Sequence, residues 1–515
     1  MAIRGFWQAA SVEPNRIAVI DIDGEEITAG SLLAAGNQLV YGLRQHGLNE
    51  GDCLAVMLPN RVEILEIIVA AMQAGWHFVA LNNNLTAPEI AYILQDSGAK
   101  AFFADSTLAQ TCTAAAQQAG LNLKYCYAVG HISYFSSYDQ LKKDQPTSLP
   151  VNRTAGQFMQ YTSGTTGKPK GVQRAIYPVD PDIMVGLLAE NLARYDIQPG
   201  GDGVHLCTSP MYHMAPLAYC YFALHFEHKV VLMQTWDAES ALLLIERHGV
   251  TSSHMVPTQF HRLLALPDDI KQLYDITSLR NILHAAAPCP IDTKQKMMAW
   301  WGPVLYEYYG ATEGGGTIAK PSDWLRYPGT VGKAWEGAEI RIFDDEREPC
   351  PVNTIGTVYM KLQQEFSYKG DYKKTQDNRI NEFFTVGDVG YLNEEGFLFL
   401  CDRKIDMIIA GGVNIYPAEV EAALHTHPLV VDAAVFGIPH AFWGEEVKAV
   451  VEVRAGVATN AELAKQIIAH CRKNIAKYKC PRSIDFIEIM PREANGKLFK
   501  RKLKAPYWAA EIVAI

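Results

Sequence analysis

The chain has 515 residues, of which 49% are hydrophobic and 20% are charged, a composition typical of globular proteins and sufficient for two or three domains. Its formal net charge of -10 argues against nucleic acid as the main partner. Its 10 cysteines include no Cys-x-x-Cys pair, which argues against a disulfide framework or a structural zinc site and favours the reducing cytoplasm. We expect no signal peptide, because the first residues have no long apolar core with a small-residue cleavage site. We expect no transmembrane segment, because prolines and histidines interrupt the uncharged stretch 203–226.

The first half alternates short apolar runs with amphipathic segments of helical period, which predicts parallel α/β layers. The predicted strands are 17–21, 53–57, 77–80 and 101–104, and the predicted helices are 31–45, 62–73 and 87–95. The alternation recurs with predicted strands 205–209, 230–233, 250–255 and 281–286, and with predicted helices that end at 226 or span 238–248 and 258–266.

From about residue 329 the pattern changes to short alternating strands and tight turns, which predicts a β-rich region with a hairpin over 390–400. A compact α+β unit is expected after it, with Pro417 starting a helix and Thr459 or Asn460 capping another. We therefore predict an α/β fold in two domains. Residues 1–402 form a large N-terminal domain of layered α/β subdomains plus a β-rich subdomain, and residues 403–515 form a small, mobile α+β C-terminal domain.

Residues 161–171 read Tyr-Thr-Ser-Gly-Thr-Thr-Gly-Lys-Pro-Lys-Gly and are the most informative segment. The glycines let successive backbone N–H groups converge on one anion, the hydroxyls add donors and the lysines add charge, so the segment predicts a phosphate-binding loop. It is not a Walker A loop, because Pro169 stands five residues after Gly164 and no Gly-Lys-Ser/Thr follows. A polar surface loop is the ordinary alternative.

Four further segments place polar residues where apolar strands end, which is where sites form in open α/β sheets. Residues 308–316 combine an aromatic side chain suited to stack on a base with a threonine and a lone glutamate suited to Mg²⁺. Residues 385–390 put Asp388 between glycines, where it could accept both hydroxyls of a ribose. Residues 402–414 and 491–497 contribute charged residues beside glycine turns. Taken singly, each segment could be an ordinary turn, core aromatic or solvated surface.

Together and in this order, the five segments closely resemble the adenylate-forming superfamily, which includes acyl-CoA synthetases, the adenylation domains of peptide synthetases and firefly luciferase. The resemblance covers essentially the whole chain and favours the branch of acyl-CoA synthetases and fatty-acid–CoA ligases. It implies that the C-terminal domain swings between two positions, and that ATP, Mg²⁺ and CoA take part in the reaction.

The resemblance also implies roles for individual residues. The loop on the β- and γ-phosphates comprises Thr162, Ser163, Gly164, Thr165, Thr166, Gly167 and Lys170. The adenosine site comprises Tyr309 and Gly310 with Ala286 and Ala287 along the adenine ring, and Asp388 and Arg403 on the ribose. The catalytic set comprises Thr312 at the α-phosphate, Glu313 as the Mg²⁺ ligand, His213 beside the carboxylate, and Lys497 bridging the carboxylate and the α-phosphate in the first half-reaction. The segment that faces the site during thioester formation contains Gly411, Gly412 and Asn414.

Two positions depart from the family's pattern. Ile405 stands where relatives commonly carry a charged hinge residue, so the sequence leaves open whether Ile405 serves as the hinge. Residues 285–288 read Ala-Ala-Ala-Pro where the family usually has Gly-Gly-Ala/Glu-Pro, which should narrow the room beside the adenine.

The expected reaction has two steps, in which a carboxylate attacks the α-phosphorus of ATP and a thiol then displaces AMP from the acyl-adenylate. No cysteine occupies a motif position, so the thiol comes from outside, with CoA preferred and an acyl-carrier protein as the alternative. We expect residues 211–226, 255–260 and 314–316 to line the acid pocket. Its side chains Tyr212, Met214, Leu217, Tyr221 and Phe222 favour a hydrophobic monocarboxylic acid, first a medium- to long-chain fatty acid and next a bulky cyclic or aromatic acid.

Three other classes remain as alternatives. A P-loop phosphotransferase would release ADP, but the chain lacks the Gly-Lys-Ser/Thr ending. A non-catalytic nucleotide sensor is disfavoured because the charged site residues are all present. A dinucleotide-binding oxidoreductase lacks its Gly-x-Gly-x-x-Gly segment after a strand. The expected partners are small molecules, and the sequence leaves monomer and homodimer open.

Overall fold

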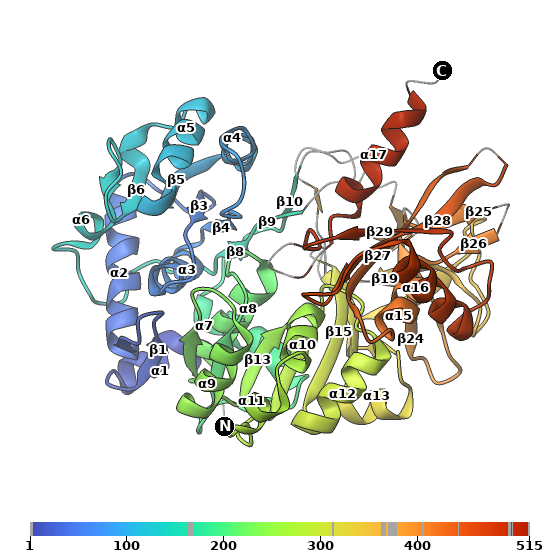
Figure 1. Ribbon diagram of the computed structural model, residues 1–515. Coiled ribbons are helices and arrows are strands. Elements are labelled where there is room, and N and C mark those ends of the chain that lie inside the picture. Colours follow the sequence, from blue (N-terminus) through green and yellow to red (C-terminus); the bar gives the residue numbers. More distant parts are fainter. Residues whose placement is uncertain are drawn as a thin grey trace.

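The computed structural model describes residues 4–162, 169–311, 314–361, 367–368, 378–403, 406–410, 413–440, 442–492, 496 and 498–512. Figure 1 shows three regions in chain order, a blue and cyan lobe, a green and yellow centre, and an orange and red C-terminal part. The described strands form two large sheets rich in parallel pairs, two antiparallel sheets and the sheet of the C-terminal part. The predicted α/β fold with a large N-terminal and a small C-terminal domain is confirmed.

The blue and cyan lobe contains a six-stranded parallel sheet with the order β7-β6-β5-β3-β4-β8. Strands β3 and β4 are buried along their whole length, as expected for parallel strands that are covered on both faces. The strands are β3 (Cys53–Met57), β4 (His77–Ala80), β5 (Ala99–Asp105), β6 (Cys126–Val129), β7 (Ser136–Ser137) and β8 (Gln157–Phe158). The helices are α2 (Ala29–Gln45), α3 (Val62–Ala74), α4 (Ala87–Ser97), η1 (Ser106–Leu108), α5 (Ala109–Ala119), η2 (Leu123–Tyr125) and α6 (Tyr138–Lys142).

The green and yellow centre contains a nine-stranded sheet with the order β17-β16-β15-β14-β13-β11-β12-β1-β2. Its strands from β1 through β12, β11, β13 and β14 to β15 are parallel neighbours. The strands are β1 (Ile17–Ile20), β2 (Glu26–Thr28), β11 (Val204–Cys207), β12 (Lys229–Leu232), β13 (Ser252–Met255), β14 (Asn281–His284), β15 (Leu305–Ala311), β16 (Gly314–Ala319) and β17 (Lys333–Ala334). The helices are α1 (Gly5–Val12), α7 (Pro181–Ala193), α8 (Met214–His225), α9 (Ala238–His248), α10 (Pro257–Leu264), α11 (Asp268–Gln272), α12 (Ile291–Trp301) and α13 (Pro321–Arg326).

One hydrophobic core is shared by α1, α2, α3 and α8, and it joins the two parallel sheets into one domain. Trp7, Leu39, Ile68 and Leu217 each lie in it without solvent exposure. Helix α3 is buried on nearly every side, which explains why its sequence is apolar all round rather than on a single stripe.

The β-rich part of the N-terminal domain is antiparallel, as its alternating pattern predicts. In the β23–β24 hairpin, the Asn393 side chain accepts a hydrogen bond from the Phe397 N–H at 2.9 Å and Gly396 takes φ +80°, so the turn residues fix the register. The strands are β9 (Gln160–Thr162), β10 (Lys170–Gln173), β18 (Glu339–Phe343), β19 (Gly356–Lys361), β20 (Ser367–Tyr368), β21 (Arg379–Ile380), β22 (Phe383–Phe384), β23 (Asp388–Leu392) and β24 (Leu398–Arg403).

The small C-terminal domain packs helices against one sheet, in which β27 and β28 form a long antiparallel pair and β29 lies parallel to β28. Two local predictions are confirmed: α15 begins at Pro417, and the Asn460 side chain caps α16 by accepting the Leu463 N–H at 2.9 Å. The strands are β25 (Ile408–Ala410), β26 (Val413–Ile415), β27 (Val430–His440), β28 (Gly444–Val453) and β29 (Ser483–Ile487), and the helices are α15 (Pro417–His425), α16 (Ala461–Asn474) and α17 (Lys500–Ile512). None of the helices described has the length and hydropathy needed to cross a bilayer.

Candidate functional site

The carboxyl ends of four neighbouring parallel strands, β15, β14, β13 and β11, meet at one edge of the nine-stranded sheet. The segments that follow parallel strands converge at such an edge, which makes it the expected place for a ligand. Here these segments are residues 208–213, 256–259 and 285–287, and the end of β15 carries Tyr309. The structure therefore brings together His213, Ala286, Ala287 and Tyr309, which the sequence analysis assigned to the site from separate parts of the chain.

Tyr309 and Asp388, both predicted to hold the nucleoside, lie in direct contact. The Tyr309 hydroxyl donates a hydrogen bond to Asp388 Oδ2 at 2.7 Å, and Asp388 is only 7% exposed. Asp388 begins β23 and pairs across the hairpin with Arg403 on β24, whose side chain is outside the described part. Gly310, next to Tyr309, pairs with Gly316 on β16. The phenol and the carboxylate therefore orient one another at the predicted adenosine site.

Replacing Tyr309 with phenylalanine is expected to raise the KM for ATP roughly 3- to 10-fold, because it keeps the ring and removes the hydrogen bond to Asp388. Asp388→Ala should raise it more, roughly 10- to 100-fold, since a charged acceptor is lost. Steady-state kinetics with varied ATP measures both effects. Tyr391→Phe is the matched control, because this tyrosine stacks on Phe399 in the same hairpin at 5.0 Å, and it should leave the KM unchanged. A Tyr309→Phe enzyme with an unchanged KM would argue against a nucleoside here.

The segment after β14 is strained at Ala286. Strand β14 ends at His284, two residues earlier than the predicted end at 286, because Ala286 takes φ +73°, which does not belong to a strand. An alanine in this left-handed region is unfavourable, whereas glycine adopts it readily. Ala286 is exposed and Ala287 half-buried, as expected for residues that would run along a ligand ring.

Ala286→Gly is expected to stabilise the protein by about 0.5–1 kcal/mol, because relief of the left-handed strain exceeds the entropy that glycine adds to the unfolded chain. Urea unfolding followed by tryptophan fluorescence measures the change. Ala285→Gly serves as control: Ala285 is buried and not left-handed, so the same substitution one residue earlier should destabilise. A destabilised Ala286→Gly variant would contradict the expectation.

His213, predicted to lie beside the carboxylate, is the N-cap residue of α8 and is half-buried. Its ring centroid lies 4.5 Å from that of Tyr212. The loop that carries it, residues 209–213, runs along the carboxyl edge of the sheet directly after β11. The structure thus places His213 at the same edge as Tyr309.

Three buried amide side chains that sequence reasoning missed hold this loop. Asn60 Nδ2 donates to the carbonyls of Ser209 at 3.1 Å and Met233 at 2.9 Å, and Asn60 Oδ1 accepts the Met211 N–H at 2.7 Å. Gln160 Nε2 donates to the Tyr212 carbonyl at 3.0 Å. Gln259 Nε2 donates to the Thr208 carbonyl at 3.1 Å. Their only signal in the sequence is that each amide stands near the end of an apolar run, which is too common to be specific.

A buried aromatic cluster lies beneath the same edge. His254 Nε2 is 3.0 Å from the Tyr308 hydroxyl, and the His254 ring stacks on Tyr219 with centroids 5.2 Å apart. Burial, followed by the charge of His213, lowers the pKa of His254 to about 3, so the ring is neutral at pH 7. Phe222, one of the predicted pocket residues, packs against this cluster, whereas Tyr221 lies in the core shared by the two parallel sheets.

A buried ion pair lies on β15 beside the carboxyl end of β14. Lys294 Nζ on α12 donates to Glu307 Oε2 at 2.8 Å, with side-chain exposures of 0% and 8%. The Lys294 ammonium also lies 4.9 Å from the ring centroid of Trp324. Burial raises the pKa of Glu307 although the charge of Lys294 opposes it. This pair supports the strand that carries Tyr309 two residues further on, and nothing in the sequence pattern indicated it.

The small domain reaches this edge through Gly496. A Cβ atom there would come within 2.8 Å of Thr258 Oγ1 and 3.2 Å of Val256 Cγ2, so the glycine lies against the start of α10. Gly496 also takes φ +79°. A side chain would therefore be both strained and crowded, and only glycine fits. The residue that follows it in the chain is Lys497.

Several predicted site residues lie outside the described residues, namely Ser163, Gly164, Thr165, Thr166, Gly167, Thr312, Glu313, Ile405, Gly411, Gly412 and Lys497. The backbones of Thr162 and Lys170 are described and pair directly across β9 and β10, so the two ends of the predicted phosphate loop stand side by side. Asn414 lies exposed in β26, opposite Ile409, and therefore belongs to the sheet of the small domain rather than to that of Tyr309.

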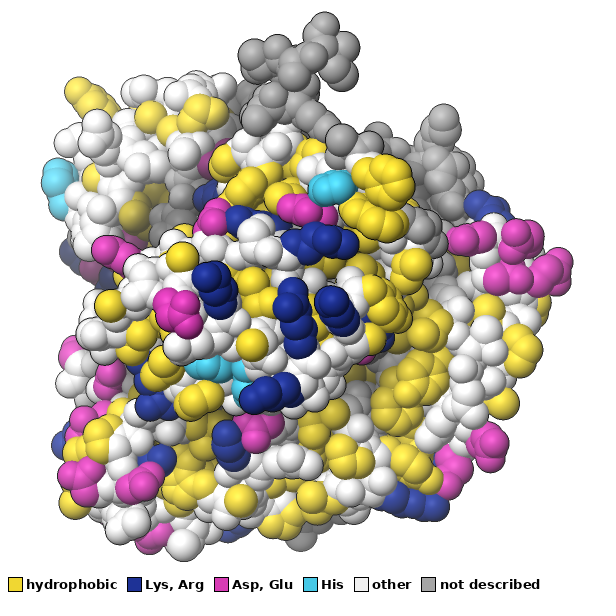
Figure 2. Space-filling model, turned by 45° about the vertical axis from the view of Figure 1, so that its right-hand side comes forward, with side chains coloured by type: hydrophobic (Ala, Val, Ile, Leu, Met, Phe, Trp, Pro, Cys, Tyr) yellow, Lys and Arg dark blue, Asp and Glu magenta, His cyan; other side chains and the backbone are white. Residues whose placement is uncertain are grey.

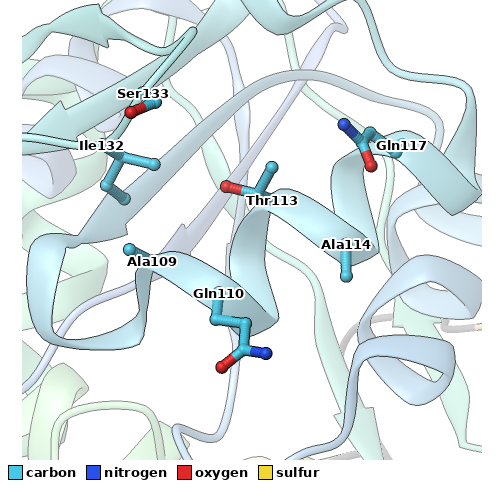
Figure 3. Close-up of a pocket in the computed structure, with 7 residues that line it drawn as sticks. All are labelled: Ala109, Gln110, Thr113, Ala114, Gln117, Ile132 and Ser133. Carbon is cyan, nitrogen blue, oxygen red and sulfur yellow. The ribbon is translucent and has the colours of Figure 1, made fainter.

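A depression of about 360 Å³ lies between α5 and residues 132–133 in the blue and cyan lobe, and Figure 3 shows the side chains that line it. Its lining residues are Ala109, Gln110, Thr113, Ala114, Gln117, Ile132 and Ser133. None of these is ionisable, so the depression offers no charge to hold a phosphate or a carboxylate. The chemistry of the chain points to the carboxyl edge of the nine-stranded sheet instead.

Comparison with known proteins gives consistent matches over the whole chain. A family model described as AMP-binding enzyme matches residues 6–367, and one described as AMP-binding enzyme C-terminal domain matches residues 419–497. The chain is 29% identical over 506 residues to 2-succinylbenzoate–CoA ligase of Bacillus subtilis (strain 168), covering 97% of each. It is 30% identical over 509 residues to long-chain-fatty-acid–CoA ligase FadD13 of Mycobacterium tuberculosis (strain ATCC 25618 / H37Rv), covering 98% of this chain and 97% of that one. The solved structure of o-succinylbenzoate CoA synthetase from Bacillus subtilis with its acyl-adenylate intermediate superposes with a TM-score of 0.79 at 28% identity, covering 97% and 98%.

Proposed function

Because this chain belongs to the family of AMP-binding enzymes, we propose that it is an AMP-forming acyl-CoA synthetase, which activates a hydrophobic carboxylic acid with ATP and transfers the acyl group to CoA. Acyl-adenylate and pyrophosphate form first, and the CoA thiol then displaces AMP. The observation that carries the proposal is the Tyr309–Asp388 contact at the strand ends, with Gly496 of the small domain docked against the same edge. A P-loop phosphotransferase is thereby set aside.

Each predicted site residue has a proposed task in this reaction. Tyr309 presents its ring to the adenine, Ala286 and Ala287 line the ring's edge, and Asp388 accepts from the ribose. His213 stands beside the reacting carboxylate, in a loop held by buried amides. The first step brings one anion onto another, so its barrier is largely electrostatic, and Lys497 supplies the ammonium between the two oxyanions. Thr312 and the loop 162–170 would bind the phosphates.

We assign the two domains to residues 1–402 and 403–515. The last strand of the β-rich sheet, β24, ends at Arg403, and the small domain's own sheet starts with β25 at Ile408. Asp402 Oδ2 accepts the Ala418 N–H at 2.8 Å, so the connection is tied to the first turn of α15. A change in the position of the small domain would require the connection between β24 and β25 to rotate, and we propose this connection as the hinge.

Mg²⁺, which accompanies ATP in this family, has its proposed protein ligand in Glu313. In nucleotide sites Mg²⁺ takes one or two carboxylates and completes its coordination with phosphate oxygens and water. A cluster of several ligating side chains is therefore not required, and none occurs among the described residues. Bound there, the ion would neutralise phosphate charge.

The acid is proposed to be hydrophobic, either a fatty acid or a bulky aromatic acid. The uncharged cluster of His254, Tyr219, Tyr308 and Phe222 lies beneath the edge where the carboxylate would react, and it offers ring surface without a fixed charge. The two relatives are named for a long-chain fatty acid and for 2-succinylbenzoate, which fits this range of acids.

We also propose a cytoplasmic location for the enzyme, since all of its 10 cysteines are free thiols.

An acyl-carrier protein remains the second candidate acceptor, because the small domain carries the opposite charge to the rest of the chain. Residues 403–515 contain 16 Lys and Arg against 12 Asp and Glu, a net of +4 in a chain of net -10. Figure 2 shows Lys and Arg side chains gathered on one face of the molecule. The exposed cations of α16 and the segment after it are Lys465, Arg472, Lys473, Lys477 and Arg482. Such a face could receive either the phosphates of CoA or an acidic carrier.

One assay tests the proposal. Pyrophosphate release is measured with ATP and Mg²⁺ over medium- and long-chain fatty acids, benzoic acid, anthranilic acid and 2-succinylbenzoic acid, each with CoA, with an acyl-carrier protein and with neither. We expect acid-dependent pyrophosphate and AMP, with a thioester only when a thiol is present. Formation of ADP, or no response to any acid, would refute the proposed function.

A further inference from the structure

Arg492 joins the small domain's core to the loop that precedes α17. Its guanidinium donates to Asp432 on β27 through Nε at 2.5 Å and Nη2 at 2.7 Å, and through Nη1 to the Gly496 carbonyl at 2.8 Å. Although burial acts to raise it, the hydrogen bonds and charge of Arg492 lower the pKa of Asp432 below its ordinary value. The carboxylate is therefore ionised at neutral pH, and the fork of the guanidinium is fixed on it.

Both ends of the same loop are tied down. The backbone of Arg492 forms an antiparallel bridge with that of Leu498, which closes the loop at its base. Near its other end, the Gly496 carbonyl accepts the hydrogen bond from Arg492 of the same domain. The Gly496 backbone also packs against Thr258 and Val256 of the N-terminal domain. The carbonyl that Arg492 binds belongs to the peptide group linking Gly496 to Lys497. Because a peptide group is planar, holding this carbonyl restricts the backbone conformations open to the residue that follows.

We propose that Arg492 is a positioning residue for acyl-adenylate formation, because it holds the carbonyl of Gly496, the residue bonded to Lys497, at the carboxyl edge of the N-terminal sheet. The inference rests on the proposed function, since it takes Lys497 to act in the first half-reaction. The proposal adds Arg492 to the residues needed for that function, because the lysine would be poorly positioned without it. Catalytic groups need to be held within a fraction of an ångström, so a lost support costs rate even when the fold survives.

A second contact docks this unit on the N-terminal domain. His261 on α10 and His425 on α15 stack with ring centroids 4.9 Å apart and planes 26° apart. Burial first, and then the facing ring, lowers the pKa of His261 to about 4; burial also lowers the pKa of His425, so both are uncharged at neutral pH. His425 Nε2 lies 3.8 Å from Asp432 Oδ1, the carboxylate that holds Arg492, and Asp292 and Arg492 are the other charges near the pair. A contiguous set of contacts thus leads from α10 to the loop.

The test separates the two half-reactions in the full-length enzyme. Arg492→Met is assayed for ATP–pyrophosphate exchange with dodecanoic acid, or with the acid that gives most pyrophosphate in the panel, and for thioester formation from CoA and preformed acyl-AMP. We expect exchange to fall roughly 10- to 100-fold and thioester formation to stay within about twofold, because the small domain has turned away by the second step. Arg492→Lys keeps the charge but lacks the fork that reaches both acceptors, so its exchange should be intermediate.

Two further variants keep the result interpretable. Arg454→Met makes the same replacement at an exposed arginine of the same domain that lies outside the cationic face of α16, and should change neither half-reaction. His261→Leu removes the stack from the N-terminal side without altering the small domain, and should lower exchange alone, roughly 2- to 10-fold. If Arg492→Met fails to fold, Arg492→Lys and His261→Leu decide the matter.

The inference is overturned if the folded variants match the wild type in exchange, or if they lose both half-reactions equally. If the wild type itself releases no pyrophosphate with any acid, the proposed function fails and the inference falls with it. The two failures are therefore told apart by the wild-type measurement.

Discussion

Lys497→Ala is expected to lower acyl-adenylate formation roughly 100- to 1,000-fold, equivalent to about 3–4 kcal/mol of transition-state stabilisation, and to leave thioester formation from preformed acyl-AMP within about threefold. The reason is electrostatic: the carboxylate and the α-phosphate repel one another, and a cation between them in a water-poor site is worth more than it would be in water. Gly496, its neighbour in the chain, is docked against Val256 and Thr258 at the start of α10, and we expect the lysine to act at the strand ends in the first step only. Exchange of labelled pyrophosphate into ATP reports the first step, and a thiol assay reports the second.

Lys502→Ala provides the matched control for this prediction. It removes a lysine from the same cationic C-terminal segment, but Lys502 is exposed on α17 and its ammonium stands over the ring of Phe499. Neither half-reaction should change by more than about twofold. If Lys497→Ala lowered both half-reactions to the same extent, one fixed arrangement of the two domains would serve both steps, and the two-position mechanism would be wrong for this enzyme.

Lys294→Met is expected to destabilise the N-terminal domain by about 3–5 kcal/mol, because it leaves the Glu307 carboxylate buried without its cation. The pKa of Glu307 is already raised by burial against the pull of Lys294, so loss of the ammonium would drive it further up and oblige the group to take up a proton on folding. Urea unfolding followed by circular dichroism and tryptophan fluorescence measures the change.

Two variants test whether the cause is the unpaired charge. Lys294→Met combined with Glu307→Gln removes both charges, and should recover most of the lost stability. Lys296 lies on the same helix, and Lys296→Met breaks only its pair with Asp292, in which both side chains are about half-exposed. The free energy of unfolding should therefore change by less than about 0.5 kcal/mol. A double variant as unstable as Lys294→Met would show that packing of the lysine stem, rather than its charge, is what matters.

Much of the fold could be predicted because helices, strands and caps depend on residues that are close in sequence. The bounds of β3, β4 and α9 agree with the prediction residue for residue, and Asn460 caps α16 as expected. The end of β14 was predicted two residues too late, since the apolar run continues through Ala286 while the backbone turns to a left-handed conformation there. Sequence periodicity records which residues are apolar, and it does not record φ.

The candidate site was predictable in its residue types and only partly in its geometry. Tyr309 and Asp388 stood out as separate signals, and the structure added that one donates to the other. Asn60 and Gln259, which hold the loop of His213, gave no usable signal, because buried amides look like any other polar residue in a single sequence. The same is true of Lys294, a charged residue on an otherwise ordinary helix.

The sequence by itself determined the layered α/β architecture and the order of the motifs, because these follow from local spacing and composition; the phosphate loop stays a prediction. Only the tertiary structure decided which distant segments meet: β1 joins the sheet beside β12, His261 stacks on His425, and Gly496 docks at the start of α10. Such contacts depend on how complementary surfaces pack and on which charges they bury. Neither quantity can be obtained from the order of residues in a single sequence.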